Sequence, residues 1–208
     1  MDELRAQLSK ALPLVLLIFV VACSDRQPRH LAAAVPASEE PFAKVDSILP
    51  TEEAMSRFLH GVVRVESLAG GAESRTELIE RFFHALAARD TAALTQLLVS
   101  RSEYGYLYYP TSIYARKPYE LPPDIAWMLN AEGNTKALRR LLARLGGSKL
   151  TLSRADCRTS TVSGADTFES DCRVTYRTSD GANHAGKLFN SIMQHDGRWK
   201  FLSLAGDL

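Results

Sequence analysis

The sequence lacks the features that mark several large classes of protein. It has no long block of charge, because 25 basic and 24 acidic residues are spread along 208 positions and leave a net charge of +1. A chain without a field of one sign has little means of gripping a polyanion, so we expect no nucleic-acid partner. A membrane-spanning helix needs about 20 apolar residues, whereas the apolar run at residues 11–22 has only twelve.

The motifs of known catalytic and metal sites are also missing. The sequence contains no glycine-rich phosphate loop, no serine nucleophile elbow, no H-E-x-x-H sequence and no four-ligand metal cluster. We therefore predict no catalytic residues, no metal and no cofactor, and we consider an enzyme the less favoured class. Catalysis would need an acid or base inside the fold. His84 is the candidate ionisable group for a pocket, with the acidic strand residues Glu169 and Asp171 as alternatives, although a lone histidine is more often structural or solvated.

The short apolar run near the start ends at a cysteine. Arg5 and Lys10 precede the sequence LPLVLLIFVVAC, and Ser24 follows Cys23 directly. A core of this length fits a signal peptide better than a permanent anchor. The small and β-branched residues before Cys23 resemble the lipobox of bacterial lipoproteins. That resemblance implies cleavage of residues 1–22 and attachment of acyl chains such as palmitate at Cys23, and two or more chains hold a protein stably on a membrane.

The same resemblance implies where the folded part lies. Serine rather than aspartate after Cys23 favours sorting to the outer membrane, with a lipid-anchored domain that faces the periplasm of a bacterial cell envelope. The alternative is an ordinary signal peptide in which Cys23 is incidental. Residues 23–50 contain four prolines and no hydrophobic periodicity, so we predict a flexible tether. Residues 51–208 are then enough for a single domain.

Helical patterns fill the first part of this domain. Thr51 begins a predicted helix after Pro50, and Ser74 with Glu77 has the spacing of a capping box before the clearest helix. Asp90 is the expected N-cap of a short helix over residues 91–98. Further helices are predicted from Pro123-Asp124 onward and over residues 134–145, in which the leucines face inward and three arginines face water: Arg139, Arg140 and Arg144.

Tyrosine is concentrated between residues 103 and 127. Six of the seven tyrosines lie there, and those at 104, 106 and 108 alternate as residues on one face of a strand do. Because tyrosine combines apolar area with a hydroxyl group, the segment is a candidate ligand or partner surface. The alternative is an irregular, proline-stiffened segment that packs its aromatic rings over one end of a sheet. The surface would consist of Tyr104, Tyr106, Tyr108, Tyr109 and Trp127.

From residue 149 onward the pattern changes to β-strands. The runs 149–158, 167–178, 184–195 and 198–204 are separated by turn sequences, which predicts a four-stranded antiparallel meander. The turns are Ser163-Gly164, Asp180-Gly181 and Asp196-Gly197. The last of them would place Ile192 opposite Phe201 and Gln194 opposite Trp199.

Two cysteines remain after Cys23, and they test this register. A hairpin that turns between Gly164 and Ala165 places Cys157 directly opposite Cys172, which is close enough for a disulfide in an oxidising compartment. Two free thiols are an alternative, and a metal pair is a poor one because no histidines lie at ligand spacing. In a regular strand Leu150 and Leu152 would lie on the opposite face from Cys157. A β-bulge near residues 154–156 would remove this conflict, so we expect one there.

Helices followed by an antiparallel sheet make an α+β fold. The helical sequence ERFFHALAARDTAALTQLL and the closing strand Trp199-Lys200-Phe201 resemble the nuclear transport factor 2-like (SnoaL-like) superfamily, over about residues 74–205. The resemblance implies N-terminal helices packed on a curved C-terminal four-stranded meander sheet that together form a cone.

Two functional hypotheses follow, because this superfamily includes both enzymes and binding domains. The first is a non-catalytic binding or assembly module that contacts an envelope protein through the tyrosine-rich segment. The second is an enzyme or carrier that takes a small apolar ligand into the cone. A closed apolar interior would favour the first, and an open cavity with a buried ionisable group would favour the second. A homodimer formed through the sheet is compatible with both.

Overall fold

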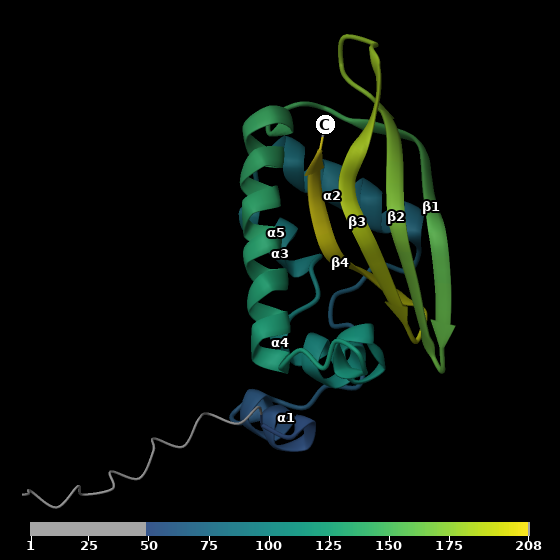
Figure 1. Ribbon diagram of the computed structural model, residues 1–208. Helices are drawn as coiled ribbons and strands as arrows, with labels where there is room; N and C mark the ends of the chain where they lie inside the picture. Colours follow the sequence, from purple (N-terminus) through teal and green to yellow (C-terminus); the bar gives the residue numbers. More distant parts are fainter. Residues whose placement is uncertain (1–48, 208) are drawn as a thin grey trace, which may run out of the picture. The chain divides into compact units, whose positions relative to one another are not determined.

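The computed structural model describes residues 49–207, which belong to one compact unit (Figure 1). The predicted signal peptide, the lipid-attachment residue Cys23 and the tether up to residue 48 lie outside the described residues. Between residues 49 and 207 no helix combines the length and the hydrophobicity that a membrane crossing requires.

Helices come first in the chain and strands last, so the predicted α+β class is confirmed. The helical part consists of α1 (Thr51–Leu59), α2 (Arg75–Ala88), α3 (Thr91–Gln96), α4 (Arg101–Glu103), the π-helical η1 (Tyr104–Tyr108), the 3₁₀ turns η2 (Tyr109–Thr111) and η3 (Ile113–Ala115), and α5 (Pro123–Leu145). The strands are β1 (Thr151–Ser163), β2 (Asp166–Arg177), β3 (Asn183–His195) and β4 (Arg198–Asp207).

Side-chain caps fix the helix starts. The Ser74 side chain accepts a hydrogen bond from the Glu77 amide at the start of α2, and the Asp90 side chain accepts one from the Ala93 amide at the start of α3. These contacts satisfy amide groups that have no partner within the helix. The N-caps predicted for both helices are therefore confirmed.

Helix α5 differs from the prediction of two separate helices, because it runs without a break over 23 residues. Gly133 lies in its middle and is exposed. A glycine inside a helix costs about 1 kcal/mol relative to alanine. The buried residues on both sides of it hold the helix together across this weak point: Ala126, Ala137, Leu141 and Leu145.

The strand pattern at Tyr104, Tyr106 and Tyr108 was also wrong, since these residues form the π-helical η1. A complete capping box begins this helical stretch four residues earlier. The Ser100 side chain accepts from the Glu103 amide, and the Glu103 carboxylate accepts from the Ser100 amide. Once the chain is helical, Tyr104 and Tyr108 lie on the same side, with ring centroids 5.1 Å apart.

The sheet is a meander in the order β1-β2-β3-β4, and its predicted registers are confirmed. Cys157 pairs with Cys172 and Ile192 pairs with Phe201. Cys157 and Cys172 form a disulfide whose Cα atoms lie 3.9 Å apart. A register shift between Leu152 and Arg154 supplies a bulge beside the expected position.

Two apolar clusters hold the layers together. In the first, α2 and α5 pack on the sheet, where the Phe82 and Phe189 rings lie 5.0 and 4.9 Å from the Phe201 ring. In the second, Tyr104, Tyr109 and Phe58 pack with Met193 of β3. The second cluster anchors the tyrosine-rich segment at one end of the sheet.

Helix α5 runs alongside β4 and seals that edge of the sheet (Figure 1). The Asn134 side chain accepts a hydrogen bond from the Leu204 amide at 2.7 Å and donates one to the Leu202 carbonyl at 3.2 Å. Asn130, one turn earlier, donates to the same carbonyl at 3.0 Å. An unpaired strand edge is a template for another strand, and the two asparagines remove that opportunity at β4.

Candidate functional site

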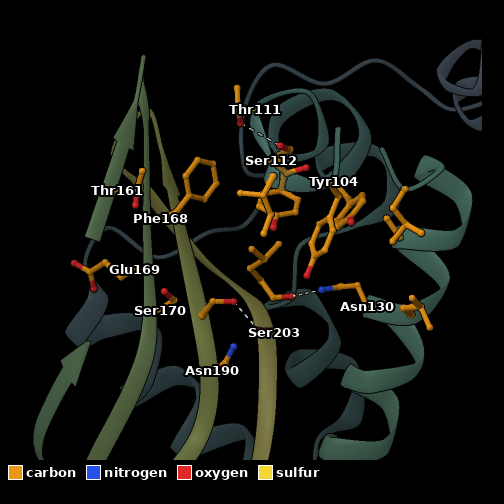
Figure 2. Close-up of a pocket in the computed structure, with 18 residues that line it drawn as sticks. Tyr104, Thr111, Ser112, Asn130, Thr161, Phe168, Glu169, Ser170, Asn190 and Ser203 are labelled. Carbon is orange, nitrogen blue, oxygen red and sulfur yellow. Dashed lines mark hydrogen bonds between the residues drawn. The ribbon is translucent and has the colours of Figure 1, made fainter. Parts of the chain in front are cut away.

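A cavity of about 600 Å³ opens between the sheet and the tyrosine-rich helical segment (Figure 2). The two walls differ in chemistry. The helical wall is mainly aromatic and apolar, and includes Tyr104, Tyr108, Ile113, Tyr114, Leu121 and Leu129. The sheet wall is mainly polar, and includes Thr161, Phe168, Ser170, Asn190, Ser191 and Ser203.

Tyr104 and Tyr108 form the base of the aromatic wall. Trp127 packs behind Tyr104 at a centroid distance of 5.2 Å, and Tyr108 meets the edge of Phe168 on β2 at 5.5 Å. Burial raises the pKa of the Tyr104 phenol well above its ordinary value and raises the pKa of the Tyr108 phenol to about 12. Both side chains are therefore neutral hydroxyl groups at physiological pH.

The five predicted surface residues do not form one surface. Tyr104 and Tyr109 are each only 1% exposed, and the Tyr109 hydroxyl donates to the Leu121 carbonyl at 2.6 Å. Tyr106 turns away from the cavity, and its hydroxyl lies 3.5 Å from the Val62 carbonyl. Trp127 is partly buried and packs against Tyr104, and it does not line the cavity. Of these five residues, only Tyr104 and Tyr108 line the cavity, because a helical turn distributes its side chains over several directions.

Three serines cross the sheet wall in a row, one on each of three neighbouring strands. Ser170 of β2 pairs with Ser191 of β3, and Ser191 pairs with Ser203 of β4. The hydroxyl oxygens of Ser191 and Ser203 lie 2.6 Å apart. We call these three residues the serine row, and sequence reasoning missed it because the strand registers had to be combined to see it.

Glu169 is the only charged residue among those that line the cavity in the described chain. Its carboxylate accepts a hydrogen bond from the Arg75 guanidinium of α2 at 2.9 Å, and its side chain is 16% exposed. An ion-paired carboxylate of this kind is neutralised by its partner. Among the described residues no second carboxylate and no histidine, lysine or arginine lines the cavity beside it.

The other candidate acids and bases lie elsewhere. His84 is exposed on α2 and does not line the cavity, so its assignment to the pocket is corrected. Helix α2 turns Phe82, Phe83, Ala85 and Leu86 inward instead. Asp171 accepts a hydrogen bond from Lys187 and pairs with Arg158, and these cations hold the pKa of its carboxyl below the ordinary value.

The mouth of the cavity carries exposed apolar side chains. Ile113 and Leu129 line the cavity and are 59% and 56% exposed. Ile125 and Met128 continue this stripe along α5, since residues three and four apart share a helix face. An apolar rim of this kind is common where a protein receives a ligand or a partner.

A second polar feature lies next to the cavity wall in the interior. Lys200 of β4 places its ammonium 2.9 and 3.0 Å from the two carboxylate oxygens of Glu103, and the side chains are 4% and 1% exposed. Glu103 also accepts from the Ala69 and Ser100 amides. Sequence reasoning missed this pair, although the Ser100–Glu103 spacing was a visible capping pattern. Within the described residues no group of three or more acidic, histidine or cysteine side chains is placed to hold a metal.

Comparison of the chain with protein-family models, curated proteins and solved structures finds no match.

Proposed function

We propose that this protein is a lipid-anchored binding module of the bacterial cell envelope, which holds a ligand in the cavity without transforming it. The observation that carries the proposal is the open cavity of about 600 Å³, where the lining residues that the structure describes offer aromatic rings and hydroxyl groups but no acid–base pair. Ligand sites are typically concave and combine apolar area with a few polar groups. We also infer that the curved sheet and its covering helices form a nuclear transport factor 2-like cone.

The open cavity changes the balance between the two hypotheses raised by the sequence. It favours a ligand inside the cone over a partner on an aromatic surface, because Tyr109 is buried and the partly buried Trp127 packs against Tyr104. The same cavity does not favour catalysis, because Glu169 is bound to Arg75 and the tyrosine hydroxyls are neutral. A carrier or a sensing domain fits this arrangement better than an enzyme.

The proposed location rests on two features of the chain. The sequence before Cys23 supports lipid attachment and outer-membrane sorting. The Cys157–Cys172 disulfide suits an oxidising compartment, since disulfides are rare in the cytosol. Mass spectrometry of the mature N-terminus tests the anchor, and an unmodified Cys23 would contradict it.

A second candidate function is assembly with an envelope protein. It is supported by the apolar rim, in which Ile113, Met128 and Leu129 are exposed. A partner that covered this rim would also close the cavity mouth. Met128 belongs to the rim but does not line the cavity, so replacing it with glutamate would then abolish the association without changing the cavity interior.

The test of ligand binding uses two tryptophan substitutions on the same strand. Asn190 is exposed and lines the cavity, so Asn190→Trp should fill the cavity at little cost to folding. Asn183 is an exposed asparagine at the start of β3 and does not line the cavity, so Asn183→Trp is the matched control. We expect native mass spectrometry of protein from membranes to show a bound small molecule in the wild type and in the control but not in Asn190→Trp. Equal occupancy in all three would contradict the proposal.

A further inference from the structure

We propose that the ligand is a neutral carbohydrate, one ring of which lies between the aromatic wall and the serine row. This inference rests on the proposed function, because it names the chemical class of the ligand in that same cavity. Four observations carry it: the two unlike walls, the spacing of the serine row, an unpartnered phenol, and the absence of unpaired charge among the lining residues.

The first observation is the contrast between the walls. A pyranose ring has an apolar C–H face and a periphery of hydroxyl groups. Tyr108 and Phe168 supply aromatic surface for the apolar face, while the serine row and Asn190 supply hydrogen-bonding groups for the periphery (Figure 2). A ligand that is apolar on one side and polar at its edges matches both walls at once.

The second observation is the spacing of the serine row. Neighbouring strands lie about 4.8 Å apart, so the row from Ser170 to Ser203 spans about 10 Å. Each serine hydroxyl can donate one hydrogen bond and accept two. One of the two hydroxyl protons lies in the hydrogen bond between Ser191 and Ser203, which leaves one O–H donor and several acceptor positions for other partners. Neighbouring hydroxyl groups of a sugar can use donors and acceptors in such a sequence.

The third observation is the Tyr104 hydroxyl. Tyr104 is only 1% exposed, and its hydroxyl makes no hydrogen bond within residues 49–207, unlike the hydroxyls of Tyr106 and Tyr109. Among the described residues, every side-chain oxygen or nitrogen that is completely shielded from solvent has a hydrogen-bond partner. The Tyr104 oxygen therefore retains access to the cavity that the residue lines. Buried tyrosines usually satisfy this group, and a ligand hydroxyl would do so here.

The fourth observation is the charge balance. Glu169 is the only charged lining residue of the described chain, and Arg75 neutralises it. The cavity thus offers no free cation for an acidic ligand and no free anion for a basic one, which favours a neutral molecule.

Two other ligand classes match the walls less well. An acyl chain would cover the serine row and the Tyr104 hydroxyl without replacing their hydrogen bonds to water. An extended peptide would need free backbone groups to pair with, but the sheet wall presents its face, where the backbone groups already pair between strands.

The test uses the full-length lipidated protein in a detergent that contains no sugar. The probes are N-acetylglucosamine and its β-1,4-linked disaccharide, with decanoate and a neutral tetrapeptide as the other ligand classes. We expect saturable binding of a sugar by calorimetry, and saturation-transfer NMR in which the C–H protons of one ring face receive the strongest effect. Tyr104→Phe removes a single oxygen, and we expect it to weaken sugar binding about threefold to tenfold, the range of one hydrogen bond.

Matched variants separate a cavity effect from a general one. Tyr119 is exposed and does not line the cavity, so Tyr119→Phe should bind the sugar as the wild type does. Ser170→Ala removes a hydroxyl group of the serine row and should also weaken sugar binding. It keeps the inference testable if Tyr104→Phe folds poorly. Sugar affinity that is unchanged in both Tyr104→Phe and Ser170→Ala would overturn the inference, and so would the lack of any saturable sugar binding.

The outcomes distinguish this inference from the proposed function. Binding of decanoate or the peptide in place of a sugar would overturn the carbohydrate assignment and leave a binding module intact. If no probe binds and native mass spectrometry shows no bound molecule in the wild type, both proposals fail.

Discussion

Lys200 and Glu103 form an ion pair that joins β4 to the start of the tyrosine-rich helical segment, with both side chains almost fully buried. The Glu103 carboxylate also accepts hydrogen bonds from the Ala69 and Ser100 amides, so this side chain links three segments of the chain. Removing one partner of such a pair leaves an uncompensated charge in the interior, which typically costs about 3–5 kcal/mol.

We therefore expect Lys200→Met to lower the free energy of unfolding by about 3–5 kcal/mol. Lys187→Met is the control, because the Lys187–Asp171 pair is partly exposed and such pairs contribute at most about 1 kcal/mol. Urea denaturation followed by circular dichroism measures both. Equal losses in the two variants would show that the buried pair does not hold the segment.

The disulfide should contribute measurably to stability. Cys157 and Cys172 are separated by 15 positions, and a loop of that size corresponds to about 3 kcal/mol in the chain-entropy description. We expect the double variant Cys157→Ala/Cys172→Ala to unfold at a lower urea concentration than the wild type. The wild type should fall to nearly the same midpoint when a reductant is present, and the variant should not respond to the reductant. A reductant-sensitive variant would contradict this account.

His195 makes stability depend on pH. Its Nδ1 atom contacts the Asp166 carboxylate and its Nε2 atom lies 3.0 Å from the Glu66 carbonyl. Burial alone would lower the pKa of His195, but these hydrogen bonds and the nearby Asp196 outweigh it and raise the pKa above the ordinary 6.5. The stabilising contribution is thus complete below about pH 6.5 and is lost as the pH rises through the folded-state pKa.

We expect the free energy of unfolding to decrease in the wild type as the pH rises above about 6.5, and this decrease to be smaller in His195→Gln. The exposed His84 offers a control, so His84→Gln should keep the wild-type pH dependence. The measurement is a series of urea titrations at fixed ionic strength. A His195→Gln variant with an unchanged pH profile would rule out the proposed contacts as its source.

Asn134 should matter more than its neighbour Asn130. Replacing Asn134 with leucine leaves the Leu204 amide without its partner, whereas the Leu202 carbonyl keeps its bond from Asn130. A buried backbone group left without a hydrogen bond costs about 1–3 kcal/mol. We expect Asn134→Leu to lose stability by that amount and Asn130→Leu to lose less, as measured by thermal unfolding. The reverse order would show that the Leu204 contact is unimportant.

The sheet was the most predictable part of the fold. Once a two-residue turn is located, residues equally far from it on the two strands must pair. The turn at Gly164 and Ala165 placed Cys157 opposite Cys172, and the turn at Asp196-Gly197 placed Ile192 opposite Phe201, and both pairs are present. Asp196 and Gly197 have φ angles of 49° and 74°, the backbone that a tight hairpin of this kind requires.

The tyrosine-rich segment was mispredicted because its alternation is accidental. The spacing of Tyr104, Tyr106 and Tyr108 matches a strand, but the Ser100–Glu103 capping box starts a helical stretch just before them. A local pattern of three residues is outweighed by the capping hydrogen bonds and by the packing of Tyr104 in the interior. The cavity itself required long-range pairings that no local pattern encodes, since its lining brings Tyr104 of η1 together with Ser191 of β3 and Ser203 of β4.

Cys172, the β2 member of the disulfide, lies two positions beyond Ser170 on the same strand. A slip of one residue between paired strands would turn every side chain to the opposite face. The covalent bond between β1 and β2 therefore guards the orientation of Ser170 as well as the stability of the sheet. A reducing environment would consequently weaken the proposed recognition in the cavity, although the disulfide itself does not line that cavity.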